Sequence, residues 1–181
     1  PAIQYLLDYN RKTLQQILTA NTDFTWKNLI VPLEEMEDRL NKCWSPVRHL
    51  HSVADEEQLR KAYNICLPLL TDYSTDMMQN HDLYLAYLQI AEGEQYTQLD
   101  AAQQMVITNA LRDFHLSGVA LDQDKKSEYK RVQQELSQLE TRFEENLLDA
   151  THAWTRAVTD PAELAGLPES ALAQAVQAAG E

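Results

Sequence analysis

A run of apolar residues late in the chain repeats at alternating intervals of three and four positions, and this spacing constrains the fold more than any other feature. Its members are Tyr129, Val132, Leu136, Leu139, Phe143, Leu147, Ala150, Trp154 and Ala157. The spacing places them on one narrow stripe of a helix, as in a coiled coil. It predicts a helix over about 122–157 that is on the order of 40 Å long and packs against an antiparallel partner helix.

Apolar stripes at helical spacing also cover most of the remaining chain. They predict helices over 3–18, 25–50, 55–80, 82–91 and 100–117, and a last one from Pro168 to Gly180. Thr25 is a candidate N-cap and Gly118 a candidate residue just beyond a helix end. Because proline lacks a backbone N–H, Pro32 and Pro46 are expected to kink or split the second helix.

The fold class predicted from these stripes is all-α, with packed helical hairpins and one long coiled-coil-like helix near 122–157. The sequence contains only four glycines and six prolines, and an all-β fold needs more turn residues than that. No low-complexity linker divides the chain, so residues 1–181 are expected to form one helical domain.

The charge of the chain limits its partners. Asp and Glu number 28 against 15 Lys and Arg, which gives a net charge of −13. Such a surface repels phosphate backbones and anionic membranes, so neither nucleic acid nor membrane is an expected partner. Cys43 and Cys66 lie on apolar helical stripes and are expected to be buried, free thiols in a reducing compartment, which favours the cytoplasm. Pro1 in place of a methionine suggests that the natural start is missing.

Motifs for phosphate binding and serine hydrolysis do not occur in the sequence. The four glycines, Gly93, Gly118, Gly166 and Gly180, are far apart. A glycine-rich phosphate loop, a dinucleotide fingerprint and a G-x-S-x-G nucleophile elbow all need closely spaced glycines.

Histidines and cysteines do not form a recognisable catalytic or metal-binding pattern either. The histidines are His49, His51, His81, His115 and His152, and none belongs to an H-E-x-x-H sequence. Asp149 and His152 are one helical turn apart, which fits a structural hydrogen bond better than a functional pair. A buried thiol stays protonated, so Cys43 and Cys66 are poor candidate nucleophiles. We therefore assign no catalytic, cofactor-binding or metal-binding residue to this chain.

Clusters of charged and aromatic residues have simple structural interpretations. The acidic run Glu34, Glu35, Glu37 and Asp38 and the basic cluster Lys125, Lys126, Lys130 and Arg131 are expected to be solvated helix faces. Trp26, Trp44 and Trp154 fall on apolar stripes and are expected to lie in the core rather than to bind a ligand.

Several short strings, taken in order, resemble the N-terminal region of the thimet oligopeptidase family of zinc metallopeptidases. They are residues 25–29 with Pro32 and Leu33, residues 45–50, residues 67–70 with Tyr73 and Ser74, residues 109–114 with 116–118, and residues 149–151, 154–155, 158–160 and 163–172. The resemblance covers essentially the whole chain without large gaps.

This resemblance implies an intracellular, mostly helical enzyme that cleaves short peptides in a deep channel between two lobes. Zinc on an H-E-x-x-H helix would polarise the scissile carbonyl, and the motif Glu would act as general base. That motif lies far downstream of the region matched here. The chain is thus expected to be a non-catalytic N-terminal piece that forms part of the channel wall, binds no zinc itself, and has the missing catalytic region and short peptides as partners.

Two other hypotheses stay open. A stand-alone helical interaction module could hold a partner helix along the 129–157 stripe. A degenerate family member could have lost its zinc site and kept a peptide-binding role. The length of the open reading frame distinguishes the first from the peptidase, and the zinc content of the complete protein distinguishes the second.

Overall fold

The structure is a computed structural model that describes residues 1–54 and 56–180, except for the side chain of Pro161. Its regular elements are all helical, and the described residues contain no β-strand. The predicted all-α class is confirmed. The chain divides into two compact units, Pro1–Glu140 and Thr141–Glu181, which are described separately below. The prediction of a single domain over 1–181 stays a prediction.

The first helix, α1 (Ala2–Ala20), has the extent that the first apolar stripe predicts. It buries Ile3, Leu7 and Leu14. Asn21 ends it in an extended conformation, and the Asn21 side-chain amide donates to the backbone carbonyl of Ile17 at 2.8 Å. The bond satisfies one of the carbonyls that a helix end leaves without a partner.

Thr25 caps the second helix as predicted. Its hydroxyl accepts from the backbone N–H of Asn28, whose side chain accepts in turn from the Thr25 N–H. The chain then forms a π-helical turn, η1 (Trp26–Ile30), which continues directly as α2 (Val31–Val53). Pro32 lies in the first turn of α2, where a missing N–H costs little. The helix also continues through Pro46, so the chain is not split there, and a kink at that proline stays a prediction.

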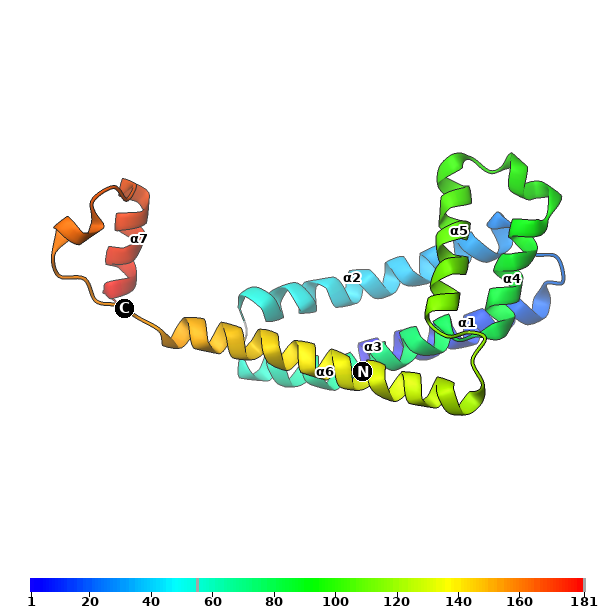
Figure 1. The fold of residues 1–181 in the computed structure, drawn as a ribbon, viewed down its shortest axis with the longest axis horizontal. Helices are drawn as coiled ribbons and strands as arrows, with labels where there is room; N and C mark the ends of the chain where they lie inside the picture. The colour runs from blue at the N-terminus through cyan, green and yellow to red at the C-terminus, as the bar shows by residue number, and fades with distance from the viewer. Residues whose placement is uncertain (55, 181) are drawn as a thin grey trace. The chain divides into compact units, whose positions relative to one another are not determined.

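The next three elements form a long helix followed by a helical hairpin. α3 spans Glu57–Met78, and its predicted start near Asp55 lies outside the described residues. α4 (His81–Glu92) is capped by Asn80, and a short 3₁₀ turn, η2 (Glu94–Gln98), leads to α5 (Ala101–Leu116). Figure 1 shows α4 and α5 side by side at the end of the unit where α2 begins and α3 ends.

Gly118 ends α5 in the way its sequence position predicts. Its φ is +80°, a conformation that glycine adopts without the strain of a Cβ. The backbone N–H groups of Val119 and Gly118 donate to the carbonyls of Phe114 and His115 at 3.0 and 3.1 Å. This is the Schellman pattern of helix ends.

Two apolar clusters hold the first unit together. The larger one joins α4 and α5 to α1, η1 and the start of α2, and the smaller one joins α1, α2 and α3. The larger contains Leu14, Leu29, Ile30, Met36, Leu83, Ala86, Ile90, Ile107, Phe114 and Val119. The smaller contains Ile3, Leu7, Leu40 and Tyr73.

The long helix α6 (Gln123–Ala153) differs from its prediction in two respects. It ends at Ala153, so Trp154 and Ala157 of the predicted stripe lie beyond it. The β-branched residues that follow have low helix propensity, and Pro161 disfavours helix in the residue before it. The predicted packing of the apolar stripe against an antiparallel helix is also wrong for the described residues. Val132, Leu136 and Leu139 of this stripe are 46 %, 45 % and 53 % exposed.

The second unit contains the last part of α6 and a C-terminal helix. The 3₁₀ turn η3 spans Pro161–Leu164, and α7 spans Glu169–Ala179, with Pro168 at its N-cap and Gly180 at its C-cap. Phe143, Leu147 and Trp154 are all more than half exposed. No described helix in either unit is long and apolar enough to span a membrane.

Candidate functional site

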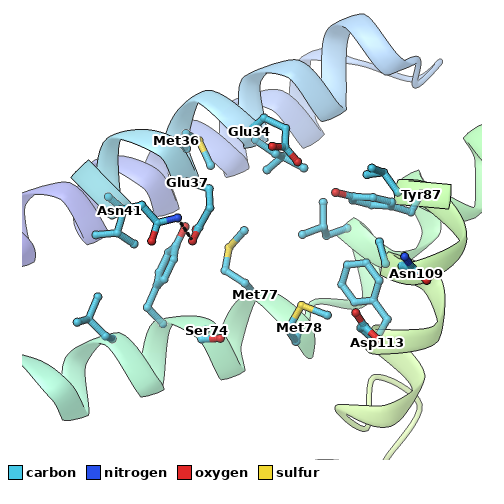
Figure 2. Close-up of a pocket in the computed structure, with 18 of the residues that line it drawn as sticks. Glu34, Met36, Glu37, Asn41, Ser74, Met77, Met78, Tyr87, Asn109 and Asp113 are labelled. Atoms are coloured by element: carbon cyan, nitrogen blue, oxygen red, sulfur yellow. Dashed lines mark hydrogen bonds between the residues drawn. The ribbon is translucent and has the colours of Figure 1, made fainter. Parts of the chain in front are cut away.

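A groove lies between α2, α3 and the α4–α5 hairpin in the first unit. Its volume is about 710 Å³, which is within the range of pockets that bind small ligands. The apolar part of its lining includes Met36, Trp44, Met77, Met78, Leu83 and Phe114. Figure 2 shows side chains from α2 and α3 pointing into this space from opposite sides, with Tyr87 of α4 closing one end. We call it the α2–α5 groove.

Three carboxylates line the groove: Glu34 and Glu37 from α2 and Asp113 from α5. Asp113 is paired with Arg112, with a nitrogen–oxygen distance of 2.8 Å. Glu37 accepts a hydrogen bond from the Asn41 amide at 3.1 Å, whereas no described cation forms an ion pair with Glu34 or Glu37. The described lining contains no lysine or arginine. The groove is therefore apolar with a negative edge along α2.

The sequence contains a signal for this edge that the prediction did not use. The whole acidic run of α2 is exposed, as predicted. Only Glu34 and Glu37, which are three positions apart, line the groove. Residues three apart share a helix face, while Glu35 and Asp38 form a second pair on a neighbouring face.

Burial in the groove changes the acid–base behaviour of two tyrosines. Burial, with a smaller contribution from the negative charge of Glu34, raises the pKa of Tyr87 to about 12. Burial also raises the pKa of Tyr73, which packs in the smaller apolar cluster. Both phenols are neutral at physiological pH and can donate or accept a hydrogen bond.

A set of charged residues, which we call the charged clasp, joins α1, α3 and the first part of α6. The Lys130 ammonium lies 2.6 Å from Asp72 and 2.7 Å from Asp76. Arg11 reaches the same two carboxylates at 3.5 and 3.2 Å. Gln134 donates to Asp72 at 3.3 Å. The clasp places two cations against two anions.

The interpretation of the basic cluster as a solvated face is wrong for two of its members. Lys130 belongs to the charged clasp, and Lys126 donates to the backbone carbonyl of Gln79 at 3.1 Å. These residues are four apart and so share the side of α6 that meets α3. Lys125 and Arg131 are exposed and pair with nearby acids, as expected of a solvated face.

The histidines occupy separate structural positions. His51 is buried and stacks on Tyr63 with ring centroids 3.9 Å apart. His115 shares a hydrogen bond of 3.2 Å with the Tyr84 hydroxyl, and His81 lies near the same tyrosine ring. His49 and His152 are exposed, as is Asp149. A structural role for the Asp149–His152 pair stays a prediction.

Metal ligands do not come together in the part of the chain that the structure describes. No group of three His, Cys, Asp or Glu side chains there could hold a metal ion. Cys43 and Cys66 are both free thiols, as predicted, but they are only partly buried. They pack at the edge of the smaller apolar cluster. The absence of catalytic, cofactor-binding and metal-binding residues stays a prediction.

The three tryptophans differ from the single role predicted for them. Trp26 packs against the larger apolar cluster, and Trp44 packs against the smaller one and stacks on Tyr63 at 4.9 Å. Both are partly buried, and Trp44 also lines the groove. Trp154 is 72 % exposed, so its assignment to the core is wrong. It follows Ala153, the last residue of α6.

Comparison with known proteins identifies relatives along almost the whole chain. Residues 3–126 match the family model described as the N-terminal domain of Neurolysin/Thimet oligopeptidase. This matched range contains the entire α2–α5 groove.

Relatives named oligopeptidase A occur in bacteria and in a plant. Oligopeptidase A of Haemophilus influenzae is 46 % identical over 99 % of this chain, and oligopeptidase A of Escherichia coli is 45 % identical over 97 %. A probable cytosolic oligopeptidase A of Arabidopsis thaliana is 35 % identical over 99 %. The matched part is 25–26 % of each relative, so the chain spans about a quarter of the length of these curated relatives.

Proposed function

The chain belongs to the Neurolysin/Thimet oligopeptidase family, and we propose that it forms the N-terminal wall of the peptide channel in a zinc oligopeptidase that hydrolyses short peptides. The observation that carries the proposal is the 46 % identity to an oligopeptidase A over 99 % of the chain. Identity at this level over the full chain supports a common fold and a common place in the larger protein.

In this proposal the chain contributes surface rather than chemistry. The sequence has no H-E-x-x-H motif, and the described residues bring no three metal ligands together. The residues that the structure describes therefore do not fit a zinc site. We place the zinc ion and the residues that act on the scissile bond in the downstream region, and derive no chemical step from this chain.

The same downstream region is the partner that we propose for α6. Val132, Leu136 and Leu139 are about half exposed on the part of α6 in the first unit. Apolar stripes of this kind are usually buried against another element. The relatives are about four times as long as the matched part, and their remaining length supplies elements that could cover this stripe. We further propose a cytosolic location, in line with the name of one plant relative, a probable cytosolic oligopeptidase A.

A hydrolysis assay tests the proposed activity. The complete protein and residues 1–181 are each incubated with an internally quenched peptide of about ten residues, with and without a zinc chelator. We expect chelator-sensitive cleavage by the complete protein and none by residues 1–181. A complete protein that stays inactive after zinc is restored would contradict the peptidase proposal and favour a degenerate, peptide-binding relative.

A second candidate function is the stand-alone interaction module. The exposure of the α6 stripe favours it, because an unpaired apolar helix face can bind a partner helix. Reading the gene beyond the codon for Glu181 separates the two proposals. A stop codon there supports the module, and a continuing frame with H-E-x-x-H supports the peptidase.

A further inference from the structure

The α2–α5 groove has features that the role of a passive channel wall does not require. A wall that only excludes folded proteins needs no concave binding site. The groove holds about 710 Å³, which is too large for a single ion and fits several peptide side chains. Its lining comes from four helices of the same compact unit.

The charges around the groove are unbalanced. Glu34 and Glu37 lie on the same edge of α2 and are both exposed to solvent. The nearby guanidinium of Arg11 lies 5.4 Å from the centre of the Tyr73 ring, but Asp72 and Asp76 already pair with it. Asp113 on the opposite side has Arg112. Glu34 and Glu37 are therefore the carboxylates of the groove lining that form no ion pair with a described cation.

A polar group inside the groove is available to a ligand. The Tyr87 ring packs edge-on against Phe114, with centroids 5.4 Å apart. Figure 2 shows the Tyr87 hydroxyl directed across the groove towards the part of α2 that carries Glu34. This hydroxyl makes no hydrogen bond to any residue that the structure describes. A neutral phenol at this position can accept a hydrogen bond from a cationic group.

We propose that the α2–α5 groove binds a lysine or arginine of a peptide, together with the apolar residues beside it. The methylene groups of the basic side chain pack on Met77 and Met78, and its cationic head lies between the Glu34 and Glu37 carboxylates within reach of Tyr87. Long basic side chains bury their stems on apolar surface and keep the charge near water or a counter-ion, which fits a groove with an apolar floor and an acidic edge.

The groove therefore selects cationic peptides over acidic ones. This selection rests on the proposed function, because it makes the groove a second contact for substrates cleaved elsewhere in the protein. Two exposed carboxylates that each pair with the bound cation contribute a factor of about ten in affinity. Salt weakens this contribution because both carboxylates are exposed.

The test compares two quenched peptides that are identical except for two lysines in one and two glutamines in the other. The groove variant is Glu34→Gln/Glu37→Gln in the complete protein. The matched control is Glu35→Gln/Asp38→Asn, which removes the same charge from the same exposed run of α2 but lies outside the groove lining. We expect the groove variant to raise KM for the lysine peptide about tenfold, and to leave the glutamine peptide and kcat unchanged.

The control variant is expected to keep the wild-type preference for the lysine peptide. Equal losses in both variants would overturn the proposal in favour of a general effect of net charge. Equal losses for both peptides in the groove variant would also overturn it, because they indicate that a downstream part of the protein occupies the groove. An unchanged KM for both peptides would contradict it directly.

A binding measurement keeps this test separate from the test of activity. The anisotropy of a fluorescently labelled lysine peptide is followed as residues 1–181 are added, for wild type and both variants. Binding that weakens about tenfold only in the groove variant supports the groove even if the complete protein cleaves nothing. Cleavage of both peptides with no binding to residues 1–181 contradicts the groove and leaves the peptidase proposal intact.

Discussion

The α4–α5 hairpin and the helix α6 are both amphipathic, yet they contact the rest of the first unit in different ways. α4 and α5 bury Leu83, Ile90, Ile107 and Phe114 to 3 % exposure or less. The first part of α6 meets α3 through Lys130, Gln134 and other polar side chains, while its apolar residues stay about half exposed. Apolar periodicity thus identifies the face of a helix that favours burial but does not identify the element that buries it.

The hairpin and the α6–α3 contact should also differ in how much they stabilise the first unit. Burial of a large apolar side chain contributes roughly 1.5–3 kcal/mol, and ion pairs at a partly exposed site contribute about 0–1 kcal/mol. The hairpin should therefore be a fixed part of the first unit. The α6 contact with α3 should be weaker and should depend on salt, unless a further element covers the apolar stripe.

The largest expected difference between the two regions comes from phenylalanine truncation. Phe114→Ala empties a site in α5 that is 2 % exposed and should lower the free energy of unfolding by about 3–5 kcal/mol. Phe143→Ala in α6 removes a side chain that is 69 % exposed and should change it by less than about 0.5 kcal/mol. Urea denaturation measures both. Similar losses for the two variants would contradict the contrast.

Tyr87→Phe tests whether the Tyr87 hydroxyl is shielded from water in the groove. In the unfolded chain the phenol ionises near its ordinary pKa of 10.0, whereas the folded pKa is about 12. Between these values the unfolded chain loses the proton first, so the stability that wild type has below pH 10 falls by up to about 2–3 kcal/mol as the pH rises. The Tyr87→Phe variant has no phenol to ionise and does not lose this stability. If the stability difference between the two proteins is the same at pH 9 and pH 11, the hydroxyl is hydrated.

Gly118→Ala tests the turn that connects the two regions. Alanine at a φ of +80° costs about 1–2 kcal/mol, and its Cβ would lie 2.5 Å from Cδ1 of Leu121. Gly180→Ala is the control, because no positive φ occurs there and the nearest atom is 3.6 Å away. Thermal unfolding should distinguish them. An equal effect would show that the Schellman turn is not rigid.

Lys130→Met should have the smallest effect, and that effect should be confined to α6. Burial alone lowers the pKa of Lys130, but hydrogen bonds with Asp72 and Asp76 outweigh it and raise the pKa above its ordinary value. The stabilisation is therefore fully present below the unfolded pKa, about 10.4, and is lost as the pH rises through the folded pKa. We expect a loss of about 0.5–1 kcal/mol at low salt and a smaller one at high salt.

The control for this variant is Arg131→Met, which removes an exposed cation that pairs only within α6 among the contacts of the described residues. Hydrogen exchange of the first part of α6 should speed up in Lys130→Met and stay unchanged in Arg131→Met. Faster exchange in both variants would indicate a general effect of charge on the helix rather than an effect of the charged clasp.

Local chemistry allowed much of the fold to be predicted. Apolar spacing located the helices, and Thr25 and Gly118 marked a beginning and an end because their hydrogen bonds involve near neighbours in sequence. The end of α6 at Ala153 and the exposure of Trp154 were missed. A continuing apolar repeat gives no information on whether a partner surface is present to stabilise the last turns of a helix.

The groove could not be predicted for a related reason. Glu34 and Tyr87 are 53 positions apart in the sequence, and only the packing of α4 against the rest of the unit brings them together. The absence of known catalytic motifs was readable from the sequence because such motifs are local. A binding surface built from four helices is not local.

The central claim, that this chain binds peptides and does not cleave them, is tested most directly by one experiment on residues 1–181. The protein is saturated with zinc, dialysed and then incubated with a quenched peptide that contains lysine. The fluorescence intensity and the fluorescence anisotropy of the peptide are recorded together. The account predicts a rise in anisotropy without any rise in intensity, and no retained zinc. Chelator-sensitive growth in intensity would contradict it, because residues 1–181 would then contain the catalytic site that we place downstream.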